Sequence, residues 1–148
     1  MTKNLHLFIL AFTVALLGTA LPASADQWEE NYEKAAKQAQ AEKKLMLLDF
    51  TGSDWCGWCI KLDNEIFSKN EFKKYAKDNL VLVKLDFPRG KSQTAAVKKQ
   101  NQELGQKYNI QGYPTVIVLD SNGQQVGQLG YMEGGPQAFI AELDKLKK

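Results

Sequence analysis

The sequence predicts an α/β domain in which a four-stranded mixed sheet is flanked by helices. Short apolar runs typical of buried strands alternate with segments whose apolar residues recur at helical spacing. The last two strand-like runs are instead separated by Asn122-Gly123, a pair that favours a tight hairpin. We therefore expect the first two strands to be parallel and the last two to form an antiparallel edge.

The first 25 residues have the layout of a secretory signal peptide. Lys3 precedes an apolar run from Leu5 to Leu21, and Ala23-Ser24-Ala25 has the small residues of a cleavage site. An uncleaved anchor is the alternative, but the run is shorter than the roughly 20 residues that a spanning helix needs. We expect cleavage after Ala25, a domain at residues 26–148, a periplasmic location, and membrane contact only through the transient signal.

The domain is predicted to begin with a helix over Asp26–Lys44. Asp26 can cap this helix, and its apolar face consists of Trp28, Tyr32, Ala35, Ala36 and Ala39. The apolar run Leu45–Phe50 follows as a buried strand, and Thr51–Asp54 interrupts it.

A second helix is predicted to start at the Cys pair and to bury Ile60, Leu62, Ile66 and Phe67. The remaining elements, in order, are a helical piece at Glu71–Lys77, a strand at Leu80–Asp86, a polar surface helix at Thr94–Tyr108, strands at Thr115–Leu119 and Gln124–Tyr131, and a closing helix with Pro136 in its first turn.

Cys56 and Cys59 are the only cysteines in the chain. Such a pair can belong to a zinc site, a haem attachment site, a structural disulfide or a redox centre. Structural zinc usually needs four Cys or His ligands, and the single histidine, His6, lies in the predicted signal. Haem attachment needs His after the second cysteine, where Ile60 stands. A structural disulfide closing so short a loop would stabilise little, so the pattern favours a redox pair without metal or cofactor.

The chain resembles the thioredoxin superfamily over nearly all of residues 26–148. Three features in order carry the resemblance: Leu48-Asp49-Phe50 leading into Trp55-Cys56-Gly57-Trp58-Cys59, then Gly112-Tyr113-Pro114-Thr115, then Asn122-Gly123 with Gly130 and a C-terminal amphipathic helix. The stretch before Cys56 is most similar to that of secreted bacterial thioredoxin-like proteins. The resemblance implies a thioredoxin fold with an added N-terminal helix.

This placement implies separate roles for the two cysteines. Cys56 would lie at the N-terminus of a helix, where unpaired N–H groups and the helix dipole favour its thiolate. We expect Cys56 to attack a substrate disulfide and Cys59, more buried and one turn later, to resolve the mixed disulfide.

The resemblance also assigns a role to Asp49, at the end of the strand that enters the site. A buried acid at the corresponding position in thioredoxins helps deprotonate the second cysteine, whereas an acid at a strand end can also be an exposed capping group. This chain has one residue more than thioredoxin between the acid and the first cysteine, which can shift Asp49 relative to Cys59.

The substrate is expected to contact Trp55, Gly57, Trp58, Tyr113 and Pro114. The resemblance implies a cis bond before Pro114, which would expose the Tyr113 backbone for pairing with a peptide. An ordinary trans proline at an edge strand is the alternative. The two tryptophans are expected to form an apolar platform, and Asp54 is interpreted as a solvated carboxylate.

The sequence therefore predicts a periplasmic thiol–disulfide oxidoreductase that reduces protein disulfides, with isomerisation of protein disulfides as the alternative reaction. Gly57-Trp58 supplies no cation to stabilise the reduced form, which favours a reducing pair. Expected partners are disulfide-bearing proteins or peptides and a membrane electron-transfer protein, with the chain a monomer. Its formal net charge is +2, or +1 without Lys3, and this argues against nucleic acid. A peptide-binding module and a maturation factor for one client, such as an apocytochrome, are the alternatives.

Overall fold

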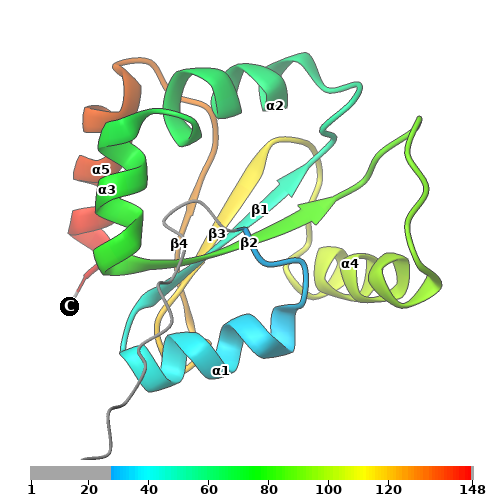
Figure 1. Cartoon of the computed structure of the whole chain (residues 1–148), viewed down its shortest axis with the longest axis horizontal. Coiled ribbons are helices and arrows are strands. Elements are labelled where there is room, and N and C mark those ends of the chain that lie inside the picture. Colours follow the sequence, from blue (N-terminus) through cyan, green and yellow to red (C-terminus); the bar gives the residue numbers. More distant parts are fainter. Residues whose placement is uncertain (1–27, 148) are drawn as a thin grey trace, which may run out of the picture.

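The computed structural model describes residues 28–147, so the predicted signal peptide and Asp26 lie outside the described residues. Figure 1 shows the elements: α1 (Tyr32–Glu42), β1 (Leu45–Thr51), α2 (Gly57–Leu62), a π-helical turn η1 (Asp63–Phe67), α3 (Asn70–Asn79), β2 (Leu80–Asp86), α4 (Ala95–Lys107), β3 (Thr115–Leu119), β4 (Gln125–Leu129) and α5 (Gly135–Leu146).

The four strands form one mixed sheet in the order β2-β1-β3-β4. β1 pairs with β2 in parallel and with β3 antiparallel, and β3 pairs with β4 antiparallel. The predicted parallel first pair and antiparallel last pair are therefore confirmed. β1, the most apolar run, is a central strand and is buried almost along its whole length.

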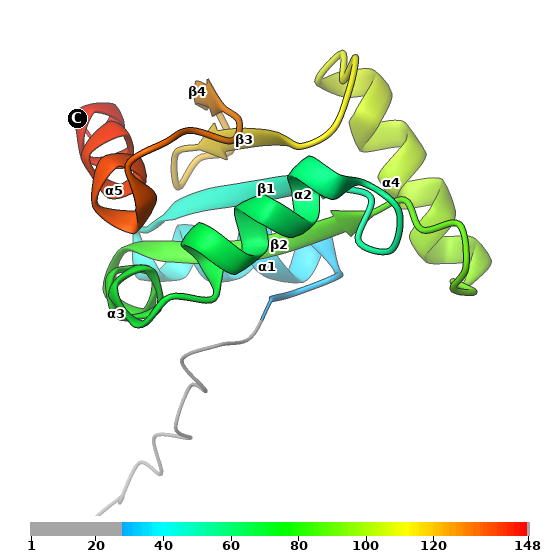
Figure 2. The ribbon, with the colours of Figure 1, turned by 90° about the horizontal axis from the view of Figure 1, so that it is seen from above.

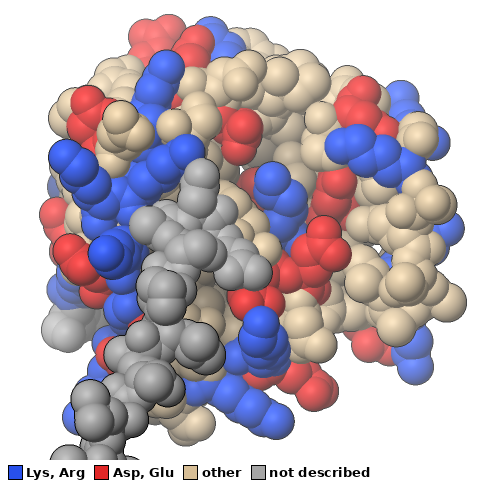
Figure 3. Space-filling view, viewed as in Figure 1, with Lys and Arg blue, Asp and Glu red and all other residues tan. Residues whose placement is uncertain are grey.

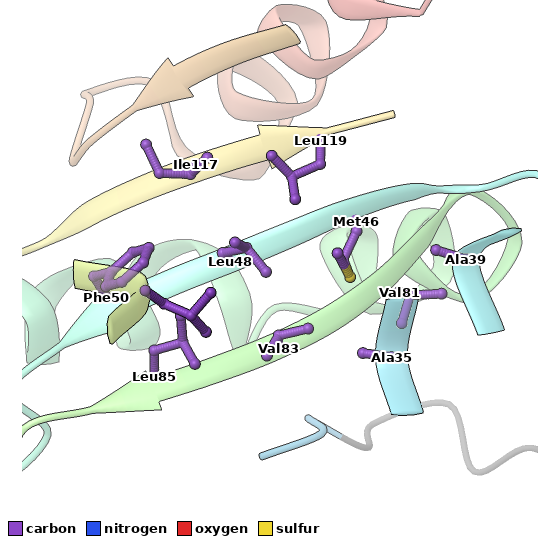
Figure 4. Close-up of a cluster of buried hydrophobic side chains, with 11 residues drawn as sticks. Ala35, Ala39, Met46, Leu48, Phe50, Val81, Val83, Leu85, Ile117 and Leu119 are labelled. Atoms are coloured by element: carbon purple, nitrogen blue, oxygen red, sulfur yellow. The ribbon is translucent and has the colours of Figure 1, made fainter. Parts of the chain in front are cut away.

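Helices cover both faces of this sheet (Figure 2). On one face, side chains of α1 and α4 pack against alternate residues of the strands, and Figure 4 shows this cluster around Met46, Leu48 and Phe50. The other face is covered by α2, η1, α3 and α5, which surround Leu47 and Val118. Because side chains alternate along β1, Asp49 points to the second face, the face that carries the Cys helix.

The helix predicted over Asp26–Lys44 starts too early, because residues 28–31 are described and are not helical. Helix α1 begins at Tyr32, after Asn31, whose side chain accepts a hydrogen bond from Lys34 N (2.9 Å). Glu29 instead pairs with the outer edge of β2, donating to Leu82 O (2.9 Å) and accepting from Lys84 N (2.8 Å). An open strand edge offers unsatisfied backbone groups, and they outweigh helical periodicity here.

The prediction that Ile60 points inward is also wrong, since Ile60 is 42% exposed. Leu62, Ile66 and Phe67 are buried as predicted. The π-helical turn adds a residue to the helix at this point. Ile60 lies before this turn and only two residues from Leu62, so the helix directs these two side chains to different sides, and Leu62 takes the buried one.

The second half of the chain follows the predicted order with shorter ends. β4 spans Gln125–Leu129 rather than Gln124–Tyr131. At the hairpin, Gly123 has φ +81°, and Asp120 Oδ1 accepts from Asn122 N and Gln124 N at 2.9 Å each. Pro136 lies in the first turn of α5.

The surface carries both signs of charge. On the face shown in Figure 3, basic and acidic side chains are interspersed, without a broad region of one sign. Among residues 28–147, no helix is both long and apolar enough to cross a membrane.

Candidate active site

Cys56 and Cys59 form a disulfide at the start of the helix that follows β1. Cys56 is the N-cap of α2, and its Sγ accepts a hydrogen bond from Cys59 N (3.2 Å). Cys59 Sγ lies deeper and accepts from Gly52 N (3.5 Å). Cys56 is 7% exposed and Cys59 is 4% exposed, so the arrangement matches the expected order of accessibility, although the difference is small.

Trp55, directly before the pair, is held on several sides. Its Nε1 donates to Phe87 O (2.8 Å), and its ring meets Tyr113 edge-on at 5.9 Å between centroids. A Cβ on Gly52 would come within 2.5 Å of the ring, so only glycine leaves room for Trp55 here. The Arg89 guanidinium carbon lies 4.0 Å from the ring centroid.

Trp58, inside the pair, is by contrast 58% exposed. Its ring lies 5.2 Å from that of Tyr131, and Lys61 Nζ lies 5.0 Å and 4.7 Å from the two ring centroids. Tyr131 OH donates to Glu65 Oε2 (2.6 Å). The two tryptophans therefore differ: the Trp55 ring is held in place by its contacts, whereas the Trp58 ring is largely exposed to solvent.

The loop before β3 reaches the same end of the sheet. The Tyr113–Pro114 peptide bond is cis. Phe50 is in register with Thr115 across β1 and β3, so Pro114 lies beside the point where β1 enters the Cys loop. The Tyr113 ring stacks near both Trp55 and Phe87, the latter at 5.2 Å.

Asp49 lies beneath the disulfide and is 4% exposed. Its Oδ1 is buried without a hydrogen-bond partner among the described residues. A cavity of about 130 Å³ is lined by Asp49, Thr51, Ser53, Cys59, Ile60, Asp63 and Lys84. The extra residue in the Thr51–Trp55 turn therefore does not separate Asp49 from Cys59, because both line one cavity.

The pKa of Asp49 is raised to about 7, chiefly because burial removes the carboxylate from water. Lys84 opposes this rise in pKa, and the negative charges of Asp63 and Asp86 add to it. Lys84 is the register partner of Asp49 on β2. A carboxyl group with this pKa can accept or release a proton near neutral pH.

Sequence reasoning missed three residues around the site. Asp63 follows Cys59 by four residues, a spacing that places two helical side chains on one side and could have been noticed. Lys84 could have been found from the pairing of β1 with β2. No local signal pointed to Arg89, because a loop far along the chain brings it to Trp55.

Asp54 is exposed to solvent, as expected, but its carboxylate also has a structural role that the sequence did not indicate. Asp54 accepts hydrogen bonds from Arg89 N (3.0 Å) and Gly90 N (2.7 Å), which hold its pKa below the usual value. Within residues 28–147, no group of three or more His, Cys, Asp or Glu side chains is arranged to hold a metal ion.

Comparison with known proteins places this site in a family. The model of a thioredoxin-like domain matches residues 32–147. The disulfide bond reductase DsbH of Chlamydia pneumoniae is 36% identical over 122 residues, which cover 82% of this chain and 73% of that protein. The thioredoxin-related protein DsbJ of the same organism is 26% identical over 130 residues, covering 86% of this chain and 37% of DsbJ.

A solved structure of a DsbH oxidoreductase superposes with a TM-score of 0.78 at 34% identity, covering 90% of this chain and 94% of that one. The range matched by the family model includes the four strands, the helices on both faces of the sheet and the Cys pair. The chain therefore belongs to the thioredoxin-like domain family and is a thiol–disulfide oxidoreductase.

Proposed function

We propose that the chain is a periplasmic reductase of protein disulfides. The observation that carries this proposal is the hydrogen bond from Cys59 N to Cys56 Sγ at the helix N-terminus. The same N–H group would stabilise a Cys56 thiolate in the reduced protein, which makes Cys56 the attacking sulfur. The similarity to a protein named disulfide bond reductase supports the reducing direction.

In the proposed reaction, the Cys56 thiolate attacks one sulfur of a client disulfide and releases the other as a thiolate. Cys59 then loses its proton and attacks Cys56 Sγ, which frees the second client thiolate. The client gains two electrons and Cys56–Cys59 becomes the disulfide. Asp49 would accept the Cys59 proton, since the two groups line one cavity and Asp49 titrates near neutral pH.

The client is proposed to lie between Trp55 and Trp58. Trp58 offers an exposed apolar ring, and the cis bond at Pro114 supports the proposal that the Tyr113 backbone pairs with an extended peptide. Gly57 lies between the cysteines, where no side chain would block the client.

The periplasmic location and the electron supply are further parts of the proposal. Residues 1–25 have the pattern of a secretory signal. A reductase in an oxidising compartment needs a source of electrons, and we propose a membrane electron-transfer protein as the donor. Fractionation of cells, with a variant lacking residues 1–25 as the control, tests the location.

The central experiment compares Cys56→Ser, Cys59→Ser and the unchanged chain on a disulfide-bonded protein substrate. We expect Cys56→Ser to lose activity. Cys59→Ser should accumulate mixed disulfides between Cys56 and the substrate, and a dithiol should release the substrate from them. A peptide-binding module would keep its function in both variants. A redox potential near the value of about −120 mV of the strong oxidant DsbA would contradict the reductase proposal.

A further inference from the structure

The loop between β2 and α4 is fixed against the Cys loop. The two carboxylate oxygens of Asp54 accept from the backbone N–H groups of Arg89 and Gly90. At the base of the loop, Ser53 donates from N and Oγ to the Asp86 carboxylate, at 2.9 and 2.5 Å. Together with the bond from Trp55 Nε1 to Phe87 O, these hydrogen bonds join the two segments, so the fold holds Arg89 beside the site.

Arg89 uses this position to lay its guanidinium on Trp55, with the central carbon 4.0 Å from the ring centroid. Trp55 is itself fixed by Phe87 O and by the close approach of Gly52. The cation is therefore held next to the residue that precedes Cys56. Stacking on an aromatic face leaves the N–H edges of a guanidinium available to another ligand.

These N–H edges have no ion pair or hydrogen bond to a side chain in the described part of the chain. The neighbouring carboxylate, Asp54, is occupied by backbone amides. Arg89 is exposed. It is therefore an ordered cation at the rim of the site whose preferred partner, a carboxylate that accepts two parallel N–H bonds, is missing from residues 28–147.

The opposite wall of the site is different. Lys61 lies over Trp58 and Tyr131, and its pKa is raised chiefly by a hydrogen bond with Tyr131 and further by the negative charges of Glu65 and Glu133. The positive charge on that wall is thus compensated by its own neighbours. On the Trp55 side the Asp54 carboxylate accepts from backbone N–H groups and forms no ion pair with the Arg89 guanidinium, so the N–H edges of this guanidinium can bind a carboxylate of a client.

We propose that Arg89 binds an Asp or Glu side chain that lies close to the reactive cysteine of the client. The inference rests on the proposed reductase function and adds a substrate class to it: disulfides flanked by acidic residues. Because the guanidinium is already ordered on Trp55, binding would cost little side-chain entropy.

The test uses peptides with one disulfide that differ only in a Glu or a Gln placed at each of several positions around the attacked cysteine. We expect the unchanged chain to reduce the best Glu peptide with kcat/KM about three- to tenfold above its Gln counterpart at low salt, within the range of one partly exposed charge pair. Arg89→Gln should abolish this preference, Arg89→Lys should keep part of it, and the matched control Lys98→Gln should leave it unchanged.

Three outcomes overturn the inference separately from the function. Equal kcat/KM for Glu and Gln peptides in the unchanged chain, or a preference that survives in Arg89→Gln, contradicts the role of Arg89 while the reductase function stands. Reduction of no peptide by the unchanged chain contradicts the proposed function itself. An equal loss of activity on Glu and Gln peptides in Arg89→Gln also contradicts the inference, because Arg89 would then act only by positioning Trp55.

Discussion

At the scale of single residues, Asp49 is the residue of the site whose burial most opposes folding. It lies in a strand whose other residues are mostly apolar, its Oδ1 has no partner among the described residues, and its pKa is about 7. In the unfolded chain the same carboxyl would titrate near 3.8. A folded pKa above the unfolded one means that the folded protein binds the proton more tightly, so ionisation opposes folding.

The sign of this linkage gives a first prediction. The contribution of Asp49 to stability should be most favourable below pH 4 and should become less favourable as the pH rises towards 7, where Asp49 ionises in the fold. Each pKa unit corresponds to about 1.4 kcal/mol, so Asp49→Asn should raise the free energy of unfolding at pH 8 by about 1–3 kcal/mol, after allowance for the unpaired amide. At pH 4 we expect almost no difference.

Denaturant titrations of the oxidised protein at pH 4 and pH 8 measure this effect. Asp78→Asn serves as the control, because Asp78 is an exposed acid on α3. A stabilisation by Asp49→Asn that is equal at both pH values would contradict the assignment of a raised pKa to Asp49. The same variant should slow disulfide reduction, so stability and activity are expected to change in opposite directions.

At the scale of elements, the π-helical turn η1 decides what else faces Asp49. Asp63 begins this turn and lines the cavity that Cys59 and Asp49 share. The charged groups acting on Asp49 are thus Asp63 from η1 and Lys84 and Asp86 from β2. Asp63 and Lys84 carry opposite charges, so removal of one or the other charge should move the pKa of Asp49 in opposite directions.

Asp63→Asn should lower the pKa of Asp49, because a like charge is removed, and Lys84→Gln should raise it. If Asp49 is the base for Cys59, the acidic limb of the pH–rate profile for reduction should shift to lower pH in the first variant and to higher pH in the second. An NMR titration of the Asp49 carboxyl carbon gives the pKa directly. Shifts in the same direction in both variants would contradict this electrostatic account.

The loop between β1 and α2 supports a prediction about packing. An Ala Cβ at position 52 would come within 2.5 Å of the Trp55 ring, so the ring or the backbone must move. We expect Gly52→Ala to lower the free energy of unfolding by about 1–3 kcal/mol, as overpacked sites do. Gly57→Ala is a suitable control for stability, because nothing lies within 4 Å of the Cβ it would add.

The elements also show how far the sequence could be read. Apolar runs located all four strands, and the Cys helix was placed correctly, because burial and hydrogen bonding at these positions are local consequences of residue type. Ile60 and the start of α1 were placed wrongly. Ile60 lies two residues from Leu62 and therefore on another side of α2. Glu29 joins a strand edge that is formed by residues more than 50 positions later. Arg89 was missed because its partner, Trp55, is distant in the sequence and is brought beside it only by the fold.

At the scale of the whole molecule, the segment before α1 wraps around an edge of the sheet. Trp28 packs on one face against Phe67, with ring centroids 5.1 Å apart. Glu29 pairs with β2 at the edge, and α1 then covers the other face. Within the described residues, this segment joins both hydrophobic clusters, so its contribution to stability should exceed that of an ordinary chain end.

Substitutions in this segment separate side-chain packing from backbone pairing. Trp28→Ala removes a half-buried ring and should cost about 2–3 kcal/mol, less than a fully buried Trp. Glu29→Ala keeps the backbone bonds and loses only the exposed ion pair with Lys34, so less than about 1 kcal/mol is expected. Glu29→Pro removes the N–H that donates to Leu82 O and should cost more than Glu29→Ala. Denaturant titrations measure these effects, and equal losses in Glu29→Ala and Glu29→Pro would show that the edge pairing does not stabilise the fold. A larger loss in Glu29→Pro would establish that this segment stabilises β2, the strand that carries Lys84 beside Asp49.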